Sequence, residues 1–279
     1  MSLAEQRLHE THRDLHATWP LLLSIDQVFA RVCAHLDETE EIVGGLLFVR
    51  AHSAYRGGVR MAASGQVPEA YMVLRGCLEL GLYAAFMAGN PDRQQRWLTR
   101  SDTAENRKRF RTEFTVGAML KAAETQSMSV GEAARSLYGH LIDFGAHPND
   151  LTLGATTTMT RTETPDATRF ETSYIVGDGL LARGALKAVA RVGVCTPMLF
   201  QTVFVHRYQL LGIDVEIEAQ QWLVAPRRRT MDWSRQGPPR TDRAAPAAQF
   251  SVPHTQGHFA RSGAVATMSV CATLPSTGI

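Results

Sequence analysis

A chain of 279 residues, of which 44% are hydrophobic and 20% charged, has the composition of a globular protein and is long enough to bury a sizeable core. The formal net charge of +2 excludes a global basic field that would attract nucleic acids or membranes non-specifically. The four cysteines show no CxxC or cysteine–histidine ligand spacing, and the N-terminal segment has no apolar signal core, so we expect a cytoplasmic protein without a disulfide scaffold or a zinc site.

Helical periodicity dominates the first half of the chain, where prolines and glycines divide it into segments. Helices are predicted over residues 3–19, 21–37, 40–64, 68–88, 90–100, 101–125 and 129–147. Pro20 is predicted to close the first helix and Gly65 to end the third, whereas Pro68 suits the first turn of the fourth. The longest apolar run is too short for a membrane span and contains Glu79, so no membrane association is predicted.

The second half of the chain begins with a threonine-rich segment at about 150–176, whose β-branched and aromatic residues predict a β-hairpin or loop insertion. Helices are predicted to return over 178–211, with a kink at Pro197, and over 214–224. The segment 226–279 is rich in arginine and proline and has little periodicity, so it is predicted to be disordered. Its arginines could contact phosphate, although a solvated tail is the simpler interpretation.

These elements predict an all-α fold class. We expect an up-and-down helical bundle over residues 1–224, with a small β-hairpin insertion at about 150–176 and a disordered C-terminal tail over 226–279. The sequence contains no Walker loop, GxGxxG or GxSxG pattern and no obvious DNA-binding motif.

Glu79 is the most unusual polar residue of the predicted bundle, because it lies in a nearly continuous apolar stretch. An isolated buried carboxylate is costly, so Glu79 requires a partner, and Arg75 lies one turn earlier on the same helix. The side of the preceding helix that we predict to pack inward carries Ile42, Leu46, Val49, Ser53, Arg56 and Arg60. This pattern predicts either an internal pocket for a phosphate or carboxylate, or an ion-pair network that fixes how the helices meet.

A second polar group lies on the last helix of the first half. His140, Asp143 and His147 fall within about 60° of one another at the edge of its apolar stripe. Arg135 projects about 140° away from His140, so these two residues would cooperate only through a bend or across a second copy of the chain. The histidine and aspartate face could form half of a metal site, but Glu79 would have to supply a further ligand, and no metal is predicted.

Two segments of the sequence resemble a group of uncharacterised bacterial helical proteins. They read SAYRGGVRMAASGQVPEAYMVLRGCLELGLYAAFMAGNPDRQQRWL and RSLYGHLIDFGAHPN. The group shares an LRxxxE pattern, seen here at Leu74, Arg75 and Glu79, and a later helix that ends in a histidine, here His147. It is similar to the HEPN (higher eukaryotes and prokaryotes nucleotide-binding) superfamily, an up-and-down bundle of about four or five helices. The resemblance covers roughly residues 40–150.

The resemblance implies a specific chemistry. Catalytic HEPN members cut RNA without a metal, using an arginine and a histidine separated by about four to six residues. The histidine acts as general base toward the 2′-hydroxyl and the arginine stabilises charge on the phosphate. Arg135 and His140 match this spacing and are the candidate catalytic residues, although Arg7 and His12 have the same spacing.

Many members of the superfamily lack catalysis, so two functions stay open. The leading expectation is a non-catalytic interaction or regulatory protein of HEPN-like fold, and the alternative is a metal-independent ribonuclease or nucleotide-binding protein. The candidate ligand-binding or polar cluster comprises Arg56, Arg60, Arg75, Glu79, His140, Asp143 and His147. The candidate partners are RNA or a nucleotide and a second copy of the chain, and no cofactor is predicted.

Overall fold

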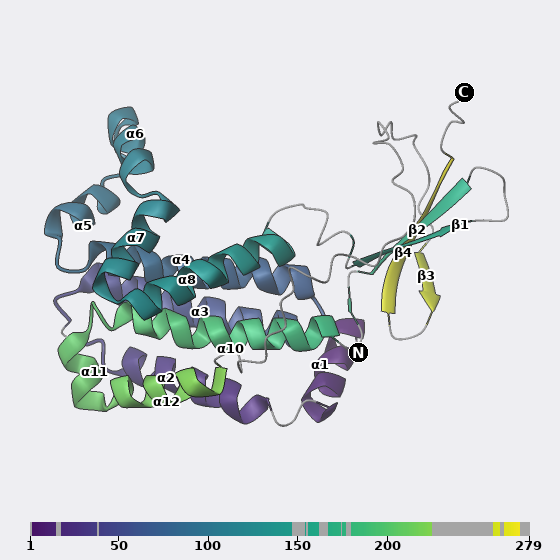
Figure 1. Ribbon diagram of the computed structural model, residues 1–279, viewed down its shortest axis with the longest axis horizontal. Helices are drawn as coiled ribbons and strands as arrows, with labels where there is room; N and C mark the ends of the chain where they lie inside the picture. Colours follow the sequence, from purple (N-terminus) through teal and green to yellow (C-terminus); the bar gives the residue numbers. More distant parts are fainter. Residues whose placement is uncertain are drawn as a thin grey trace.

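The structure is a computed structural model, and it shows the all-α bundle that the sequence predicts (Figure 1). It describes residues 2–14, 18–37, 39–146, 154, 156–161, 167–173, 175–176, 180–224, 259–262 and 265–273. The first helices are α1 (Leu3–Asp14), α2 (Trp19–Ala34), α3 (Ile42–Ala63), α4 (Val67–Met87), α5 (Pro91–Leu98) and α6 (Ala104–Glu113). They are followed by α7 (Val116–Gln126), α8 (Met128–Leu141), the π-helical turn η1 (Ile142–Ala146), α10 (Leu180–Phe200), α11 (Val205–Leu211) and α12 (Ile213–Val224).

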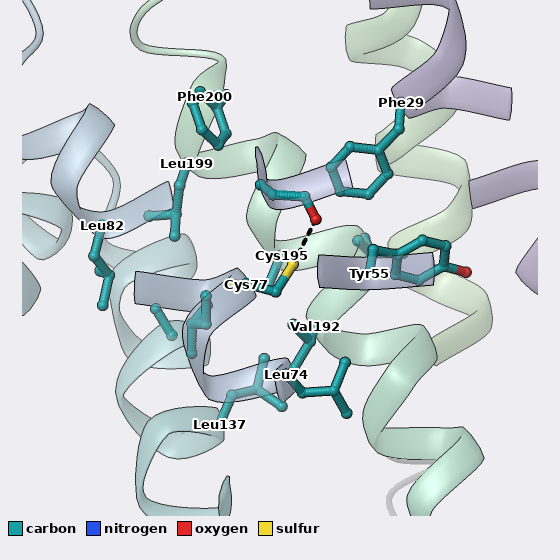
Figure 2. Packing of buried hydrophobic residues seen from close by; sticks show 14 of the residues in the cluster. Phe29, Tyr55, Leu74, Cys77, Leu82, Leu137, Val192, Cys195, Leu199 and Phe200 are labelled. Atoms are coloured by element: carbon teal, nitrogen blue, oxygen red, sulfur yellow. Dashed lines mark hydrogen bonds between the residues drawn. The ribbon is translucent and has the colours of Figure 1, made fainter. Parts of the chain in front are cut away.

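The long helices α3, α4 and α10 form the centre of the bundle, where each contacts the other two. Helices α2 and α12 pack against α10, and α7 and α8 pack against α4 (Figure 1). Their buried side chains form a hydrophobic cluster, part of which Figure 2 shows. Two polar groups inside this cluster are hydrogen-bonded to the backbone: the Tyr55 hydroxyl donates to the Leu22 carbonyl at 2.9 Å and the Cys77 thiol donates to the Ala51 carbonyl at 3.3 Å.

Glycines set how closely the central helices approach. A Cβ added to Gly193 of α10 would lie 2.4 Å from Cε2 of Tyr55, and one added to Gly58 of α3 would lie 2.7 Å from Cδ2 of Leu74. A glycine inside a helix costs about 1 kcal/mol relative to alanine, so it is retained where a neighbouring helix leaves no room for a side chain.

Helix α3 faces the core with the side opposite to the one predicted. The side chains of Ile42 and Leu46 are 67% and 62% exposed, whereas Phe48 and Tyr55 are fully buried. The buried side of α3 carries both its large aromatic rings and the small residues that let α4 approach, so it buries more apolar area than the opposite side would. As a consequence, the arginines that were predicted to point inward lie on the outer face of α3.

Local sequence signals predicted some helix boundaries correctly and others wrongly. The Asn90 side chain accepts a hydrogen bond from the Arg93 backbone N–H at 3.0 Å and caps α5 as expected. Pro20 lies in the first turn of α2 and does not close the preceding helix, because a proline lacks only an N–H that the first turn leaves unpaired. The helix predicted over 101–125 is divided by a second cap at Thr115, whose hydroxyl accepts from the backbone of the next helix.

The helix predicted over 178–211 is also divided. Pro197 lies inside α10, and the sharp bend comes later, between α10 and α11, which are inclined by 118°. The Tyr208 hydroxyl of α11 donates to the Pro197 carbonyl at 3.1 Å, so α11 folds back against the end of α10.

The predicted hairpin forms from β1 (Thr157–Arg161) and β2 (Ala167–Ser173), which pair antiparallel inside the expected insertion. Two further strands, β3 (Phe259–Ser262) and β4 (Val265–Thr273), extend it into a sheet of order β1-β2-β4-β3, which lies beyond one end of the bundle (Figure 1). The prediction of a disordered tail did not include these strands, because their pairing partner lies far earlier in the chain. The rest of 226–279 lies outside the described residues.

Helix α4 is long and apolar enough to cross a membrane by composition alone. Within the apolar window of α4, however, 61% of the residues are buried in the bundle, as in the central helix of a globular protein. Helices α10 and α11 meet the same criterion only as a bent pair.

Candidate functional site

Glu79 is paired with Arg75, as the sequence predicts. The Arg75 Nε donates to Glu79 Oε1 at 2.8 Å, and the Tyr138 hydroxyl of α8 donates to the same oxygen at 3.1 Å. Burial lowers the pKa of the Arg75 guanidinium, but the Glu79 carboxylate more than offsets this, and the pKa lies above its usual range. The two side chains keep 28% and 27% of their exposure, so this is a half-buried ion pair at the contact of α4 with α8 and not a sealed pocket.

Arg56 does not reach Glu79, because it crosses to α2. Its Nε donates to Asp26 Oδ1 at 2.7 Å and its Nη2 to Oδ2 at 2.8 Å, which makes a bidentate pair. His52 shares the carboxylate, with Nε2 at 2.7 Å from Oδ1. The Arg56 hydrogen bond holds the pKa of Asp26 below its usual value, against the opposing effect of burial, and His52 lowers it further. Arg60 is exposed on the outer face of α3.

Arg135 and His140 lie on different sides of α8. The Arg135 Nε donates to Glu124 Oε1 of α7 at 2.6 Å, and the Arg135 side chain is 51% exposed. The His140 ring lies against Tyr71 and Phe144, with centroids 5.5 and 4.6 Å away. One copy of the chain therefore does not bring this arginine and this histidine to a common point.

The surroundings of His140 keep its imidazole neutral near pH 7. Burial lowers the pKa of His140 and the positive charge of Arg191 lowers it further, while Asp143 acts in the opposite direction. Asp143 is exposed and lies in η1, and His147 lies outside the described residues. Across the part of the chain that the structure describes, no three histidine, cysteine, aspartate or glutamate side chains are arranged to hold a metal ion.

The described residues of the predicted polar cluster thus do not meet, and those that have named partners lie at three separate places. One network joins α2 to α3 through Asp26, a second joins α4 to α8 through Glu79, and His140 lies among aromatic rings. Asp26 and His52 could not be predicted as partners, because they come from different helices and share no spacing along the chain.

A basic surface on α6 was also missed. Arg107, Lys108, Arg109 and Arg111 are exposed, and none of them forms an ion pair with an acidic residue of the described ranges. Three of them line a shallow concavity of about 370 Å³ with Ala104 and Thr112. The run NRKRFR shows this positive charge in the sequence, since four cations lie within five residues and no acidic residue lies between them.

Helix α6 stands away from the central helices (Figure 1). Its anchor is Phe110, whose ring stacks on Phe114 with the centroids 4.6 Å apart and lies 6.3 Å from Tyr83. The Asn106 side chain donates to the Thr99 carbonyl at 2.9 Å and ties α6 to the end of α5. The Arg96 side chain of α5 also donates to the two carboxylate oxygens of Glu113 at 2.6 and 2.8 Å. The cations are therefore presented on a projecting helix that these aromatic, hydrogen-bond and ion-pair contacts hold against its neighbours.

The chain was compared with known protein families, curated proteins and solved structures. No protein-family model, no curated protein and no solved structure matches the chain.

Proposed function

We propose that this chain is a non-catalytic interaction protein with a HEPN-like bundle, and that it binds RNA through the basic surface of α6. The observation that carries the proposal is the set of exposed, unneutralised cations lining one concavity on a projecting helix. Phosphate groups along a nucleic acid strand are the ligands that such a surface attracts, and each contact releases a counterion. The resemblance to HEPN proteins favours RNA as the strand.

Two features of α8 support a binding role over catalysis. Arg135 is engaged by Glu124 on one side of the helix, and His140 packs between aromatic rings on another. General base chemistry on RNA needs both groups at one phosphodiester, which requires them to converge. The networks around Asp26 and Glu79 are likewise internally paired.

The proposal is tested by RNA binding at several salt concentrations. Fluorescence anisotropy with a labelled single-stranded RNA of mixed sequence would compare the wild-type chain with the variant Arg107→Gln, Lys108→Gln, Arg111→Gln. Each lost phosphate contact with a single strand reduces the slope of log affinity against log salt by about 0.7, so we expect a reduction of about 2 and a loss of affinity of at least about tenfold.

The matched control removes the same kinds of charge elsewhere. Arg50, Arg60 and Lys187 are exposed, and their triple replacement by glutamine leaves the net charge equal to that of the α6 variant. Equal weakening in both variants, or no RNA binding by the wild-type chain, would contradict the proposal.

A metal-independent ribonuclease is the second candidate, and the lowered pKa of His140 favours it, because a general base must be unprotonated near pH 7. RNA incubated with the chain in a chelator would be shortened in that case. Cleavage that is lost in both His140→Gln and Arg135→Gln would replace the non-catalytic proposal with the enzymatic one, whereas intact RNA would support binding alone.

A further inference from the structure

Cys33, His52 and Asp26 form a continuous chain of polar contacts between α2 and α3. The Cys33 Sγ lies 3.7 Å from His52 Nδ1, and the opposite ring nitrogen, Nε2, lies 2.7 Å from Asp26 Oδ1. This is the order of thiol, imidazole and carboxylate that activates a cysteine for nucleophilic attack. The proposed RNA surface on α6 does not use these groups.

The neighbours of His52 fix both its tautomer and its plane. A carboxylate can only accept a hydrogen bond, so Nε2 carries a proton, and in the neutral imidazole Nδ1 then presents its lone pair to the Cys33 thiol. Arg56 holds the carboxylate from the other side through two hydrogen bonds. The Phe29 ring stacks on the imidazole with 5.2 Å between centroids and 5° between planes, which restricts rotation of the ring.

The thiol of Cys33 differs from the other described thiols in its access to solvent. Cys33 is partly exposed, whereas Cys77 and Cys195 are buried in the core and burial raises the pKa of each to about 12. Burial also raises the pKa of Cys33, with the charge of Arg56 opposing and that of Asp26 adding to the rise. Cys33 is therefore a thiol and not a thiolate near pH 7, so it depends on a base to react.

We propose that Cys33 is a thiol–disulfide exchange site at which His52, positioned by Asp26 and Arg56, removes the thiol proton. The reaction partner is a low-molecular-weight disulfide. The Cys33 Sγ attacks one sulfur of that disulfide while its proton passes to His52 Nδ1; the new Sγ–S bond forms and the old S–S bond breaks. The departing thiolate takes the proton from His52 and leaves as a thiol, so Cys33 is oxidised to a mixed disulfide while the departing sulfur is reduced, and the small disulfide is the oxidant.

Among the described residues, few charged or titratable groups act on Cys33. Asp26 of α2 and Arg56 of α3 act electrostatically on Cys33, and Cys33 in turn acts on the buried Tyr208 of α11. Tyr208 is hydrogen-bonded to a backbone carbonyl, and burial keeps its pKa well above the usual range, so it stays neutral at the pH values of the experiment. His52 is the neighbour with an acceptor nitrogen directed at the thiol.

The experiment measures the rate at which glutathione disulfide forms a mixed disulfide at Cys33 of the full chain, followed by mass spectrometry of peptides. Near pH 7 we expect His52→Gln to react at least about tenfold more slowly than wild type, in keeping with the size of general-base effects. Near pH 10.5 we expect the two rates to approach each other, because hydroxide then removes the thiol proton without help from His52. The matched control is His35→Gln, which changes an exposed histidine at the end of the same helix and should react like wild type.

Cys77 reports on folding in the same samples. Cys77 is fully buried, so its modification would reveal that the core of the variant has opened. In that case Asp26→Asn would be used in place of His52→Gln, because it keeps His52 but removes the carboxylate that orients it. Equal rates of wild type and His52→Gln near pH 7 with Cys77 protected would overturn the proposal, as would the absence of a mixed disulfide at Cys33. A difference that persists unchanged near pH 10.5 would also overturn it, because it would indicate altered access and not proton transfer.

Discussion

Two carboxylates of the bundle, Asp26 and Glu79, lie at contacts between helices but are bound in different ways. Asp26 and Glu79 are similarly accessible, with side chains 25% and 27% exposed. Asp26 accepts hydrogen bonds from two residues of another helix, whereas Glu79 accepts one from Arg75 of its own helix and one from Tyr138 of a neighbour. The charge on Asp26 therefore joins two helices, while the charge on Glu79 is neutralised locally.

This difference shows which network depends on the tertiary fold. An arginine and a glutamate four residues apart attract each other even on an isolated helix, so the Arg75–Glu79 pair gains little when the bundle forms. Asp26, His52 and Arg56 meet only when α2 lies against α3. We expect substitutions on the α2–α3 side to affect the free energy of unfolding more strongly.

The largest loss of stability should come from a change where α10 packs against α2 and α3. In Gly193→Ala the new Cβ would lie 2.4 Å from Tyr55 and 2.8 Å from Ile25, so α10 must move away from both helices. We expect a loss of about 3 kcal/mol in the free energy of unfolding measured by urea denaturation. Gly76→Ala on α4 is the control, because its Cβ meets no atom within 4 Å, and it should be stabilising by up to about 1 kcal/mol. Similar losses in both variants would show that close approach at α10 is not the cause.

The two carboxylates can be compared directly by matched substitutions. Asp26→Asn should reduce the free energy of unfolding by about 1.5 kcal/mol, because charge-assisted hydrogen bonds to Arg56 and His52 are weakened. Glu79→Gln should reduce it by about 0.5 kcal/mol, the usual value for a half-exposed pair on one helix. Equal effects in urea denaturation would refute the distinction between a tertiary and a local network.

The contributions of His140 and Asp26 to stability should depend on pH in different ranges. The pKa of folded His140 lies below its ordinary value of 6.5, so its contribution to stability is complete above pH 6.5 and declines as the pH falls through the folded pKa. The pKa of Asp26 lies below 3.8, so its contribution declines only when the pH falls below that value. Urea midpoints of wild type and His140→Gln should therefore converge between pH 7 and pH 5, whereas those of wild type and Asp26→Asn should stay apart until the solution is more acidic. Parallel curves for the His140 pair would contradict the first expectation.

The smallest effect on stability is expected for the ion pair that joins Arg135 of α8 to Glu124 of α7. Arg135 and Glu124 are joined at the surface, where water competes for both charges. Arg135→Ala should leave the thermal unfolding midpoint unchanged, and Glu124→Gln should give the same result. A clear shift in either variant would mean that this contact contributes to stability more than its exposure suggests.

Local sequence signals predicted the helices well, because caps and apolar periodicity act over a few residues. The cap at Asn90 and the pairing of Arg75 with Glu79 both follow from spacing along one helix. The orientation of α3 could not be predicted in this way, because two of its sides carry apolar residues and only packing against α4 and α10 selects one.

The candidate sites show the same limit. The contact of Asp26 with His52 and that of Glu79 with Tyr138 depend on which helices are neighbours, and no spacing in the sequence encodes that. The basic surface of α6 could have been predicted, since its four cations lie within five residues, but its projection from the bundle could not. The pair Arg135 and His140 had the expected spacing, yet the helix turns the two side chains apart.

The order of strands in the sheet determines when it can form during synthesis. The bundle is complete once α12 has been made, whereas β4, which pairs with β2, lies near the C-terminal end of the sequence. Until β4 leaves the ribosome, β2 has one edge whose backbone N–H and C=O groups lack their strand partner, and such an edge can pair with other extended chains. The sheet can thus form only after the bundle, and in the interval the nascent chain carries an unpaired edge of β2 that β4 later covers.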